Sequence, residues 1–443
     1  MFGIENKKGE GCKGEGCRVP FFTEMRRIMN IGLFTETYYP EINGVANSVY
    51  MLKEQLERMG HNAYVFTTTT PGAPEKEHNV FRVKSIPCAF LTERRIGMFY
   101  SPKLANIIKG LNLDVIHTNT EFSLGIFGRI MARELDIPVI HTYHTIYEDY
   151  THYIAHFRAI DRRAKSFVRA YSKFCCNSAG RVIVPTDKVR QLLGEYKVNQ
   201  EIAIIPTGID LDKFRRENYN REEIEEIKKE LGIGADEKVI LYIGRVSQEK
   251  NIAEVIDGFA EYVRHREKVR LLIVGSGPEL DKLKEQGKKL GLEDEIIFAG
   301  ARPWDEIGKY YLTGDVFVSA SQSETQGLTY IEAMAAGLPV VAKKDACLNG
   351  IVKNGVNGYQ TTGREEFVTA LDDVLNPEKW PEYSRQALLA VKPYSKEFFA
   401  ESILSLYEEI QTEGEEAEAE KSSGGYPRIY FQKFVEMRRG LRK

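Results

Sequence analysis

The feature that most constrains the fold is a regular alternation of short apolar runs with longer helical patterns. The runs are strand-length, and charged or turn residues bound each of them. In the first series they are Met29–Phe34, Ala63–Phe66, Asp114–His117, Pro138–His141, Arg181–Val184 and Glu201–Ile205. Strands that alternate with helices form parallel sheets whose faces are covered by those helices. The sequence therefore predicts an α/β fold that begins near Met29.

The alternation stops in a charged stretch after Pro206 and then restarts, which indicates a second domain of the same class. The second series is Val239–Ile243, Leu271–Val274, Glu295–Phe298, Asp315–Val318 and Pro339–Val341. A chain of 443 residues is long enough for two such domains, each with its own core. We expect an N-terminal extension over 1–28, Rossmann-like domains over 29–206 and 207–392, a helix over 393–412 that packs back toward the first domain, and an acidic linker with a basic aromatic tail over 413–443.

Charge, cysteine content and hydropathy narrow the class of protein. A net charge of −3 argues against a dedicated nucleic-acid binder, whose partner demands a strongly basic surface. The six cysteines show no disulfide-framework spacing, and no secretory leader precedes them, so we expect a reduced, cytoplasmic setting. No apolar run approaches the roughly 20 residues that a bilayer-spanning helix needs. We therefore expect a protein that does not span a membrane.

The most informative segment is 314–339, which has the pattern of a strand, a loop, a helix and a helix stop. Gly327 opens the predicted helix, so backbone N–H groups and the positive end of the helix dipole face the loop that carries Glu324. Glu332 lies roughly 7 to 8 Å further along the helix. An anion is expected between them, with one carboxylate near sugar hydroxyls and the other near ribose hydroxyls. The alternative is that both glutamates are ordinary solvated surface charges.

Two basic residues follow the first strand of the second series. Arg245 and Lys250 lie past its carboxyl end, which is where open α/β sheets bind ligands. Arginine can bind a phosphate through two hydrogen bonds and lysine supplies a point charge, so the pair could offset a diphosphate. A further turn with Gly275 and Gly277 lacks the third glycine of a dinucleotide fingerprint, which disfavours a nicotinamide enzyme.

The first domain contributes a glycine and two histidines. Gly44 follows the first strand and would let the backbone approach a bound ligand closely, although an ordinary turn also uses glycine. His141 and His144 leave the carboxyl end of another strand, at the edge expected to face the second domain. Either histidine could equally serve packing alone.

At these residues the chain resembles the retaining GT-B glycosyltransferases of family 4, from about residue 29 to about residue 410. Glu324 and Glu332 match the Glu-x7-Glu signature of that family, and Arg245 with Lys250 match its diphosphate-binding basic pair. Gly44 matches its N-terminal donor-site glycine. His144 matches its active-site histidine.

The resemblance implies a role for each residue. Glu324 would contact the transferred hexose, Glu332 the ribose, and His144 the sugar at the reacting centre. The diphosphate would bind the backbone of Gly327, Leu328 and Thr329. The donor would be a UDP-sugar, held as a substrate with no tightly bound cofactor.

The mechanism expected for the family needs neither an enzymic nucleophile nor a general base, because a donor phosphate oxygen takes the acceptor proton as the leaving group departs. No Asp-x-Asp metal site is expected, and a divalent metal is not expected to be essential. Glucose is the expected donor sugar, but Gln326 departs from the aromatic residue that many members carry, which leaves galactose open.

The segment 141–153 is similar to the subgroup of this family that glucosylates diacylglycerol, so a lipid acceptor is expected. The next segment, 156–174, alternates apolar and basic residues at helical spacing and could lie on anionic lipid, with each basic residue contributing about 1 kcal/mol. The predicted membrane and acceptor residues are Arg158, Arg162, Arg163, Lys165, Phe167 and Arg169. The alternative is a core-packing helix with a solvated face.

The tail 426–443 repeats this basic and aromatic chemistry, and we expect its removal to weaken binding to anionic vesicles. The enzyme would then work at the inner face of the cell membrane. Other acceptors remain open, among them a teichoic-acid precursor, a polyprenyl-linked glycan or a small molecule. So do a nucleotide-sugar epimerase or phosphorylase of the same architecture, and a non-catalytic sugar-nucleotide sensor.

Overall fold

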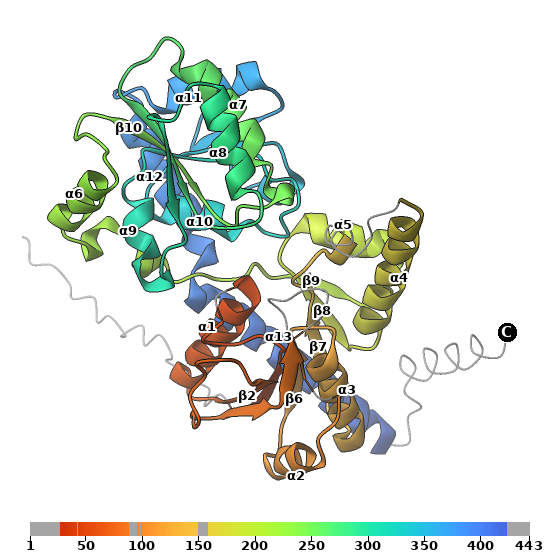
Figure 1. Cartoon of the computed structure of the whole chain (residues 1–443). Helices are drawn as coiled ribbons and strands as arrows, with labels where there is room; N and C mark the ends of the chain where they lie inside the picture. Colours follow the sequence, from red (N-terminus) through yellow and green to blue (C-terminus); the bar gives the residue numbers. More distant parts are fainter. Residues whose placement is uncertain (1–26, 42, 88–94, 98, 149–157, 423–443) are drawn as a thin grey trace, which may run out of the picture.

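The computed structural model describes residues 27–41, 43–87, 95–97, 99–148 and 158–422 (Figure 1). They form two lobes, each built on a parallel sheet with helices packed on it. The first lobe contains β1 to β9, and the second contains β10 to β15. The predicted α/β fold with two Rossmann-like sheets is confirmed. The expected extension over 1–28 falls almost wholly outside the described residues, and the tail over 426–443 falls outside them entirely.

The first sheet has seven parallel strands in the order β3-β2-β1-β6-β7-β8-β9. These are β1 (Asn30–Phe34), β2 (Asn62–Thr68), β3 (Val80–Val83), β6 (Val115–Thr118), β7 (Val139–Thr142), β8 (Arg181–Val184) and β9 (Ile202–Ile204). A separate antiparallel pair joins β4 (Ser85–Pro87) to β5 (Arg95–Gly97). The helices of this lobe are α1 (Gly44–Arg58), α2 (Pro102–Gly110), α3 (Ser123–Leu135), α4 (Arg158–Asn177) and α5 (Asp187–Glu195).

The second sheet has six parallel strands in the order β12-β11-β10-β13-β14-β15. They are β10 (Lys238–Ile243), β11 (Val269–Val274), β12 (Ile296–Gly300), β13 (Val316–Ser319), β14 (Val340–Lys343) and β15 (Gly358–Thr361). Its helices are α6 (Arg221–Glu230), α7 (Ile252–Val263), α8 (Leu280–Lys289), α9 (Ile307–Tyr311), α10 (Leu328–Ala335), α11 (Arg364–Val374) and α12 (Trp380–Ala390). Each strand predicted from the sequence is present in one of the two sheets.

The strand β10 shows why these segments read as unbroken apolar runs. Val239, Leu241 and Ile243 pack into the cluster on one face of the sheet. Ile240 and Tyr242 pack into the cluster on the other face. Side chains alternate between the faces of a strand, so a strand covered by helices on both faces must be apolar at every position.

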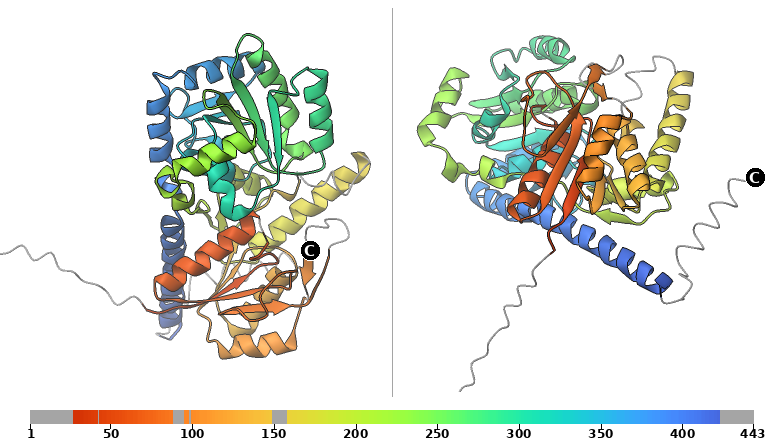
Figure 2. Two further views of the ribbon diagram at one scale, coloured as in Figure 1. Left: turned by 60° about the vertical axis from the view of Figure 1, so that its left-hand side comes forward. Right: turned by 90° about the horizontal axis from the view of Figure 1, so that it is seen from below.

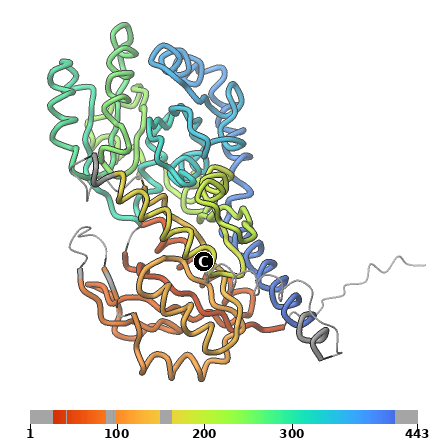
Figure 3. The backbone as a smooth tube through the Cα atoms, turned by 90° about the vertical axis from the view of Figure 1, so that its right-hand side faces the viewer, coloured from red at the N-terminus to blue at the C-terminus, as the bar shows by residue number. Residues whose placement is uncertain are grey.

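The chain passes between the lobes twice, and the two passages are paired. The Ile209 N–H donates to the Tyr394 carbonyl (2.8 Å), and the Lys396 N–H donates to the Ile209 carbonyl (3.0 Å). Helix α13 (Lys396–Ser422) then runs back along the first lobe, as the tube in Figure 3 shows. Its Phe399 and Ile403 share a core with the strands of the first sheet.

The C-terminal helix is longer than the sequence predicts. The acidic run that begins at Glu413 was expected to be a linker, but α13 continues through it to Ser422. Glutamate and alanine are strong helix formers, and helix formation propagates readily from a packed segment such as 399–410.

Within the described residues, no helix is both long and apolar enough to cross a lipid bilayer.

Candidate active site

The loop between β13 and α10 reaches its helix through Gly327. This residue has φ 75° and ψ 60°, which is left-handed backbone that residues with a Cβ rarely adopt. A Cβ at this position would lie 2.4 Å from the Tyr330 ring. Leu328 and Thr329 form the first turn of α10, where backbone N–H groups have no partner within the helix. The helix start that the sequence predicts at Gly327 is therefore present.

The Glu324 carboxylate is held before any ligand arrives. The Lys250 ammonium, in the turn after β10, donates to Glu324 Oε1 at 2.5 Å, and both side chains are largely buried. Burial raises the pKa of Glu324, but the charge and hydrogen bond of Lys250, with the charge of Lys188, outweigh burial and leave the pKa below its usual value. An ionised carboxylate thus lies beside the start of α10.

Glu332 has a contrasting environment one turn into α10. Its side chain is buried, and Oε2 accepts a hydrogen bond from the Tyr311 hydroxyl at 2.6 Å. Burial raises the pKa of Glu332 to about 7, although the Tyr311 hydrogen bond and the charge of Lys213 oppose that rise. The predicted pair of carboxylates therefore consists of one ionised group and one that titrates near neutral pH.

Arg245 is exposed in the loop after β10, next to the turn that carries Gly275 and Gly277. A Cβ on Gly275 would lie 1.9 Å from the Gly244 carbonyl oxygen, and one on Gly277 would lie 2.1 Å from that of Val246. These glycines let two loops pack backbone against backbone. The close packing explains them without a dinucleotide.

Gly44 lies opposite the start of α10, across the two lobes. Asn43 caps α1 by accepting hydrogen bonds from the N–H groups of Val45 (3.1 Å) and Ala46 (3.0 Å). A Cβ on Gly44 would lie 3.4 Å from Leu328 Cδ1. The structure thus brings together Gly44 and Leu328, two residues that the sequence assigned to one site from opposite ends of the chain.

His144 belongs to a polar network at the carboxyl edge of the first sheet, where it contacts Asn119. Its Nε2 lies 3.2 Å from Asn119 Oδ1, and the Asn119 amide nitrogen donates to the His117 carbonyl (3.4 Å). Because Asn119 Oδ1 can only accept, His144 carries its proton on Nε2 and has an acceptor lone pair on Nδ1. Burial and the neighbouring His141 lower the pKa of His144 to about 4, against the opposing charge of Glu121.

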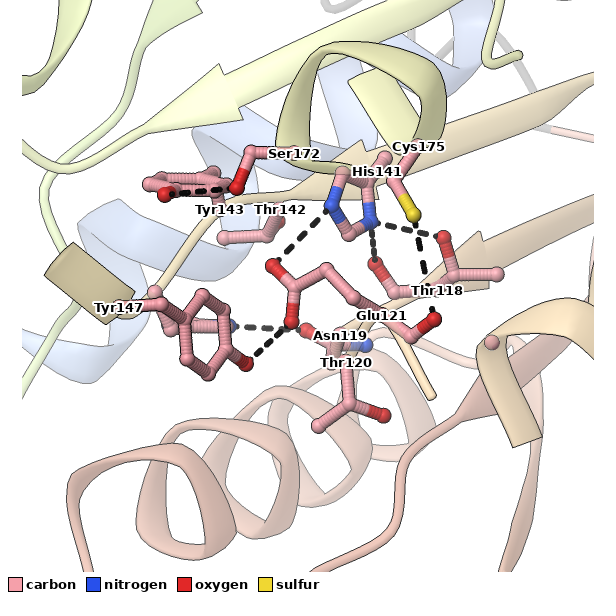
Figure 4. A network of polar contacts seen from close by, with 12 residues as sticks. Thr118, Asn119, Thr120, Glu121, His141, Thr142, Tyr143, Tyr147, Ser172 and Cys175 are labelled. Carbon is pink, nitrogen blue, oxygen red and sulfur yellow. Dashed lines mark hydrogen bonds and ion pairs between the residues drawn. The ribbon is translucent and has the colours of Figure 1, made fainter. Parts of the chain in front are cut away.

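The sequence analysis missed Glu121, which lies at the centre of this network (Figure 4). Its Oε1 lies 3.5 Å from His141 Nε2, and its Oε2 accepts a hydrogen bond from the Tyr147 hydroxyl. His141 Nδ1 lies 3.0 Å from the Thr118 carbonyl oxygen, which can only accept, so Nδ1 carries a proton. The Glu121 and His141 side chains are both buried. The rule that pointed to the histidines also covers Glu121, since it follows β6.

Gln326, the predicted departure from the family pattern, faces the passage between the lobes. Its buried side-chain amide accepts from the Thr207 N–H (2.8 Å) and donates to the Thr207 carbonyl (2.8 Å). This residue therefore ties the Glu324 loop to the first passage of the chain.

Helix α4, the predicted membrane element, stands at the outer side of the first lobe in Figure 1 and at one side of the molecule in the right-hand view of Figure 2. Phe167 is 70% exposed and Phe174 is 64% exposed. Arg162 and Arg163 are exposed and Lys165 is half-buried, whereas the Arg158 side chain lies outside the described part. Arg169 differs, because its guanidinium binds both oxygens of Glu148, at 2.5 and 2.9 Å.

Two further observations bear on other binding sites. A cavity of about 430 Å³ opens at the amino edge of the second sheet, lined by Arg264, Arg266, Lys268, Arg270 and Asp294 among others, and it contains none of the predicted site residues. Across the described ranges, no three His, Cys, Asp or Glu side chains come together in a way that could hold a metal ion.

Comparison with known families matches both lobes. Residues 42–213 match the family model described as Glycosyltransferase Family 4, and residues 223–388 match the model described as Glycosyl transferases group 1. The chain belongs to the family 4 glycosyltransferases.

Two relatives narrow the comparison. The chain is 43% identical over 348 residues to the alpha-monoglucosyldiacylglycerol synthase of Streptococcus pneumoniae, covering 78% of each chain. It is 37% identical over 388 residues to the protein of the same name from Acholeplasma laidlawii, covering 86% of this chain and 96% of that one. Both similarities extend over most of the two lobes.

Solved structures confirm the GT-B fold. Anabaena HepE in complex with UDP and glucose aligns with a TM-score of 0.66 at 20% identity, covering 86% of this chain and all of that one. Sucrose-phosphate synthase from Thermosynechococcus elongatus aligns with a TM-score of 0.68 at 22% identity, covering 86% and 99%.

Proposed function

We propose that the chain is a retaining glycosyltransferase that moves glucose from UDP-glucose to diacylglycerol at a membrane surface. The observation that carries the proposal is the start of α10, where Glu324 is ionised on one side and Glu332 is buried on the other. The names of the two synthases support glucose and diacylglycerol as the substrates.

The donor would lie along the first turn of α10. Glu324 would accept hydrogen bonds from the hexose and Glu332 from the ribose, while the backbone of Gly327, Leu328 and Thr329 would bind the diphosphate. An ammonium has three donors, so Lys250 can bond Glu324 and a phosphate oxygen together. Arg245 would add a second cation. These charges would stabilise the diphosphate as it leaves.

The transfer exchanges one C–O bond for another on the same face of the sugar. The bond from the anomeric carbon to the UDP oxygen breaks, the acceptor oxygen bonds that carbon, and the departing phosphate oxygen takes the acceptor proton. His144, neutral and with an acceptor at Nδ1, would bind a hexose hydroxyl and orient the anomeric carbon. Gly44 would allow the first lobe to close on the donor.

Helix α4 would place the enzyme on the inner face of the cell membrane. Exposed phenylalanines beside arginines suit the interface between acyl chains and anionic headgroups. Because Phe167 and Phe174 are exposed, they do not form the core-packing face that the alternative interpretation of this helix requires.

The enzymatic proposal is tested by incubating the full chain with labelled UDP-glucose or UDP-galactose and diacylglycerol in anionic micelles. The expected product is an α-linked glucosyl lipid made from UDP-glucose. A β-linked product would contradict retention. If the label moved only to a different acceptor, diacylglycerol would be the wrong substrate.

The membrane proposal is tested by the double variant Phe167→Ala with Phe174→Ala in a vesicle sedimentation assay. We expect binding to anionic vesicles to weaken by about tenfold or more, given about 1.5–3 kcal/mol for a fully buried phenylalanine. Phe398→Ala is a matched control, since Phe398 is 49% exposed on α13. Equal sedimentation of all three proteins would contradict the role of α4.

A further inference from the structure

We propose that Lys188 is a positioning residue of the donor site, which reaches from the first lobe and fixes the loop that carries Glu324. This inference rests on the proposed function, because it assigns the loop to the hexose of the donor. Lys188 lies in the first turn of α5, just past the carboxyl end of β8.

Within the described residues, the hydrogen bonds of the Lys188 ammonium all go to groups of the second lobe. It donates to the carbonyl oxygens of Gln322 and Glu324, both at 3.0 Å. It also binds both carboxylate oxygens of Asp345, at 2.9 and 2.8 Å. The Lys188 side chain is 20% exposed and that of Asp345 is 5% exposed. A largely buried lysine with several acceptors holds the backbone groups that it binds in place. An exposed ion pair, in contrast, contributes little to stability.

Asp345 is itself fixed in place. It follows β14 and caps the short helix η6 (Ala346–Leu348), with Oδ1 accepting from the Cys347 N–H at 2.8 Å. Lys188 therefore connects the Glu324 loop to a rigid position at the end of a neighbouring strand.

Two more contacts from outside the second lobe act on the same loop. The Thr186 hydroxyl donates to the Thr325 carbonyl at 2.7 Å, and Gln326 pairs with the Thr207 backbone. The backbone from Gln322 to Gln326 is thus held by α5, by the residue before it and by the first passage between the lobes.

Glu324 is therefore restrained from both lobes. Lys250 of its own lobe holds the carboxylate, and Lys188 of the other lobe holds the carbonyl. Without Lys188, two loop carbonyls would lose a donor and the buried Asp345 would lose its cation. The loop would shift, and Glu324 with it. Glu332 and the first turn of α10 have none of these contacts, so the binding of UDP alone would change little.

The test measures the affinity of the full chain for UDP and for UDP-glucose by calorimetry, with turnover in the micelle assay. Because a displacement of about 1 Å can cost about 100-fold in rate, Lys188→Met is expected to lower kcat by about 100-fold and weaken UDP-glucose binding by about tenfold. Its affinity for UDP should stay within about twofold. Lys238→Met is the matched control, since Lys238 pairs with Asp315 inside the second lobe at 3.0 Å. The Lys238→Met variant should match the wild type in its affinities for UDP and for UDP-glucose.

Each other outcome is decisive. Equal weakening for UDP and UDP-glucose would mean a general structural role and would overturn the inference, as would unchanged binding of both. If the wild type bound neither nucleotide, the proposed function itself would fall. If Lys188→Met did not fold, Thr186→Val would replace it, because it removes one loop contact and should show the same selective loss at smaller size.

Discussion

The carboxyl edges of the two sheets occupy equivalent places in their lobes but carry opposite chemistry. At the first edge, His117, His141 and His144 lie in a hydrogen-bonded network, and burial lowers the pKa of each. At the second edge, Lys250 pairs with Glu324. The histidines of the first edge are neutral, oriented hydrogen-bonding groups, and the second edge presents charges. The first is suited to orienting hydroxyls and the second to holding an anion.

The difference has a physical cause. The imidazoles are desolvated, and a buried histidine favours its neutral form. The Glu324 carboxyl is desolvated as well, but the nearby ammonium groups outweigh burial and keep it ionised.

The largest effect is expected on the charged edge. Glu324→Ala should lower kcat by about 100- to 1,000-fold, the size expected when one preorganised contact at a reacting centre is lost. Micelle assays measure the rate, and circular dichroism should show a folded protein. Glu285→Ala is the matched control, because it breaks the exposed Lys289–Glu285 ion pair (2.7 Å) on α8. Wild-type turnover by Glu324→Ala would remove the assigned hexose contact.

On the neutral edge, His144→Ala should lower kcat/KM by about 10- to 100-fold, as expected for the loss of one or two hydrogen bonds. The pKa of His144 is about 4, so the wild type should show no loss of activity from histidine protonation between pH 5 and 8. A bell-shaped profile with a limb near pH 6.5 that disappears in His144→Ala would show that this histidine titrates, contrary to a neutral orienting role.

Glu332 provides the sharpest pH test, since burial raises its pKa to about 7. Above that pH the carboxylate can accept from both ribose hydroxyls, and below it the free enzyme must first lose a proton. The affinity for UDP-glucose should therefore fall below pH 7, by up to about tenfold per pH unit. Glu332→Gln should bind weakly with little pH dependence in calorimetric titrations from pH 5.5 to 8.5. A wild type without pH dependence would contradict this assignment.

The raised pKa of Glu332 should also make the stability of the protein depend on pH. The folded pKa of Glu332 is raised, so between pH 4.5 and 7 the folded state binds more protons than the unfolded state. The contribution of Glu332 to the free energy of unfolding should then decrease as pH rises through this window. Urea unfolding across the window should show that decrease in the wild type, and a smaller one in Glu332→Gln.

The smallest effect is expected at Tyr407 on α13, whose hydroxyl lies 2.6 Å from His117 Nδ1. Tyr407→Phe should lower the free energy of unfolding by about 1 kcal/mol, the net value of a buried hydrogen bond. Turnover should be unchanged, since neither group belongs to the donor site. A large loss of activity in a folded Tyr407→Phe would show that the network transmits more than stability.

The fold was largely predictable because buried parallel strands are apolar at every position and stand out from the helices. The strands that the sequence analysis missed lack this signal. β15 reads Gly-Tyr-Gln-Thr at the edge of its sheet, and β3 is interrupted by Arg82 at the edge of the other. Edge strands need less apolar surface, so period and hydropathy do not identify them.

Site residues could be predicted where their position after a strand was enough to identify them. They could not be predicted where their role depends on contacts between distant segments. The carboxyl-end rule led to Arg245 and His144. It gave no reason to connect Lys188 with Asp345, which are 157 positions apart. Similarly, the role of Gln326 depends on Thr207, a residue of the first passage between the lobes.

The most direct test of the central claim is a crystal of the full chain soaked with UDP. We expect the diphosphate at the first turn of α10, with the ribose on Glu332 and Arg245 and Lys250 beside the phosphates. Nucleotide bound instead in the cavity near Arg264 and Arg270, or no nucleotide at saturating concentration, would contradict the account.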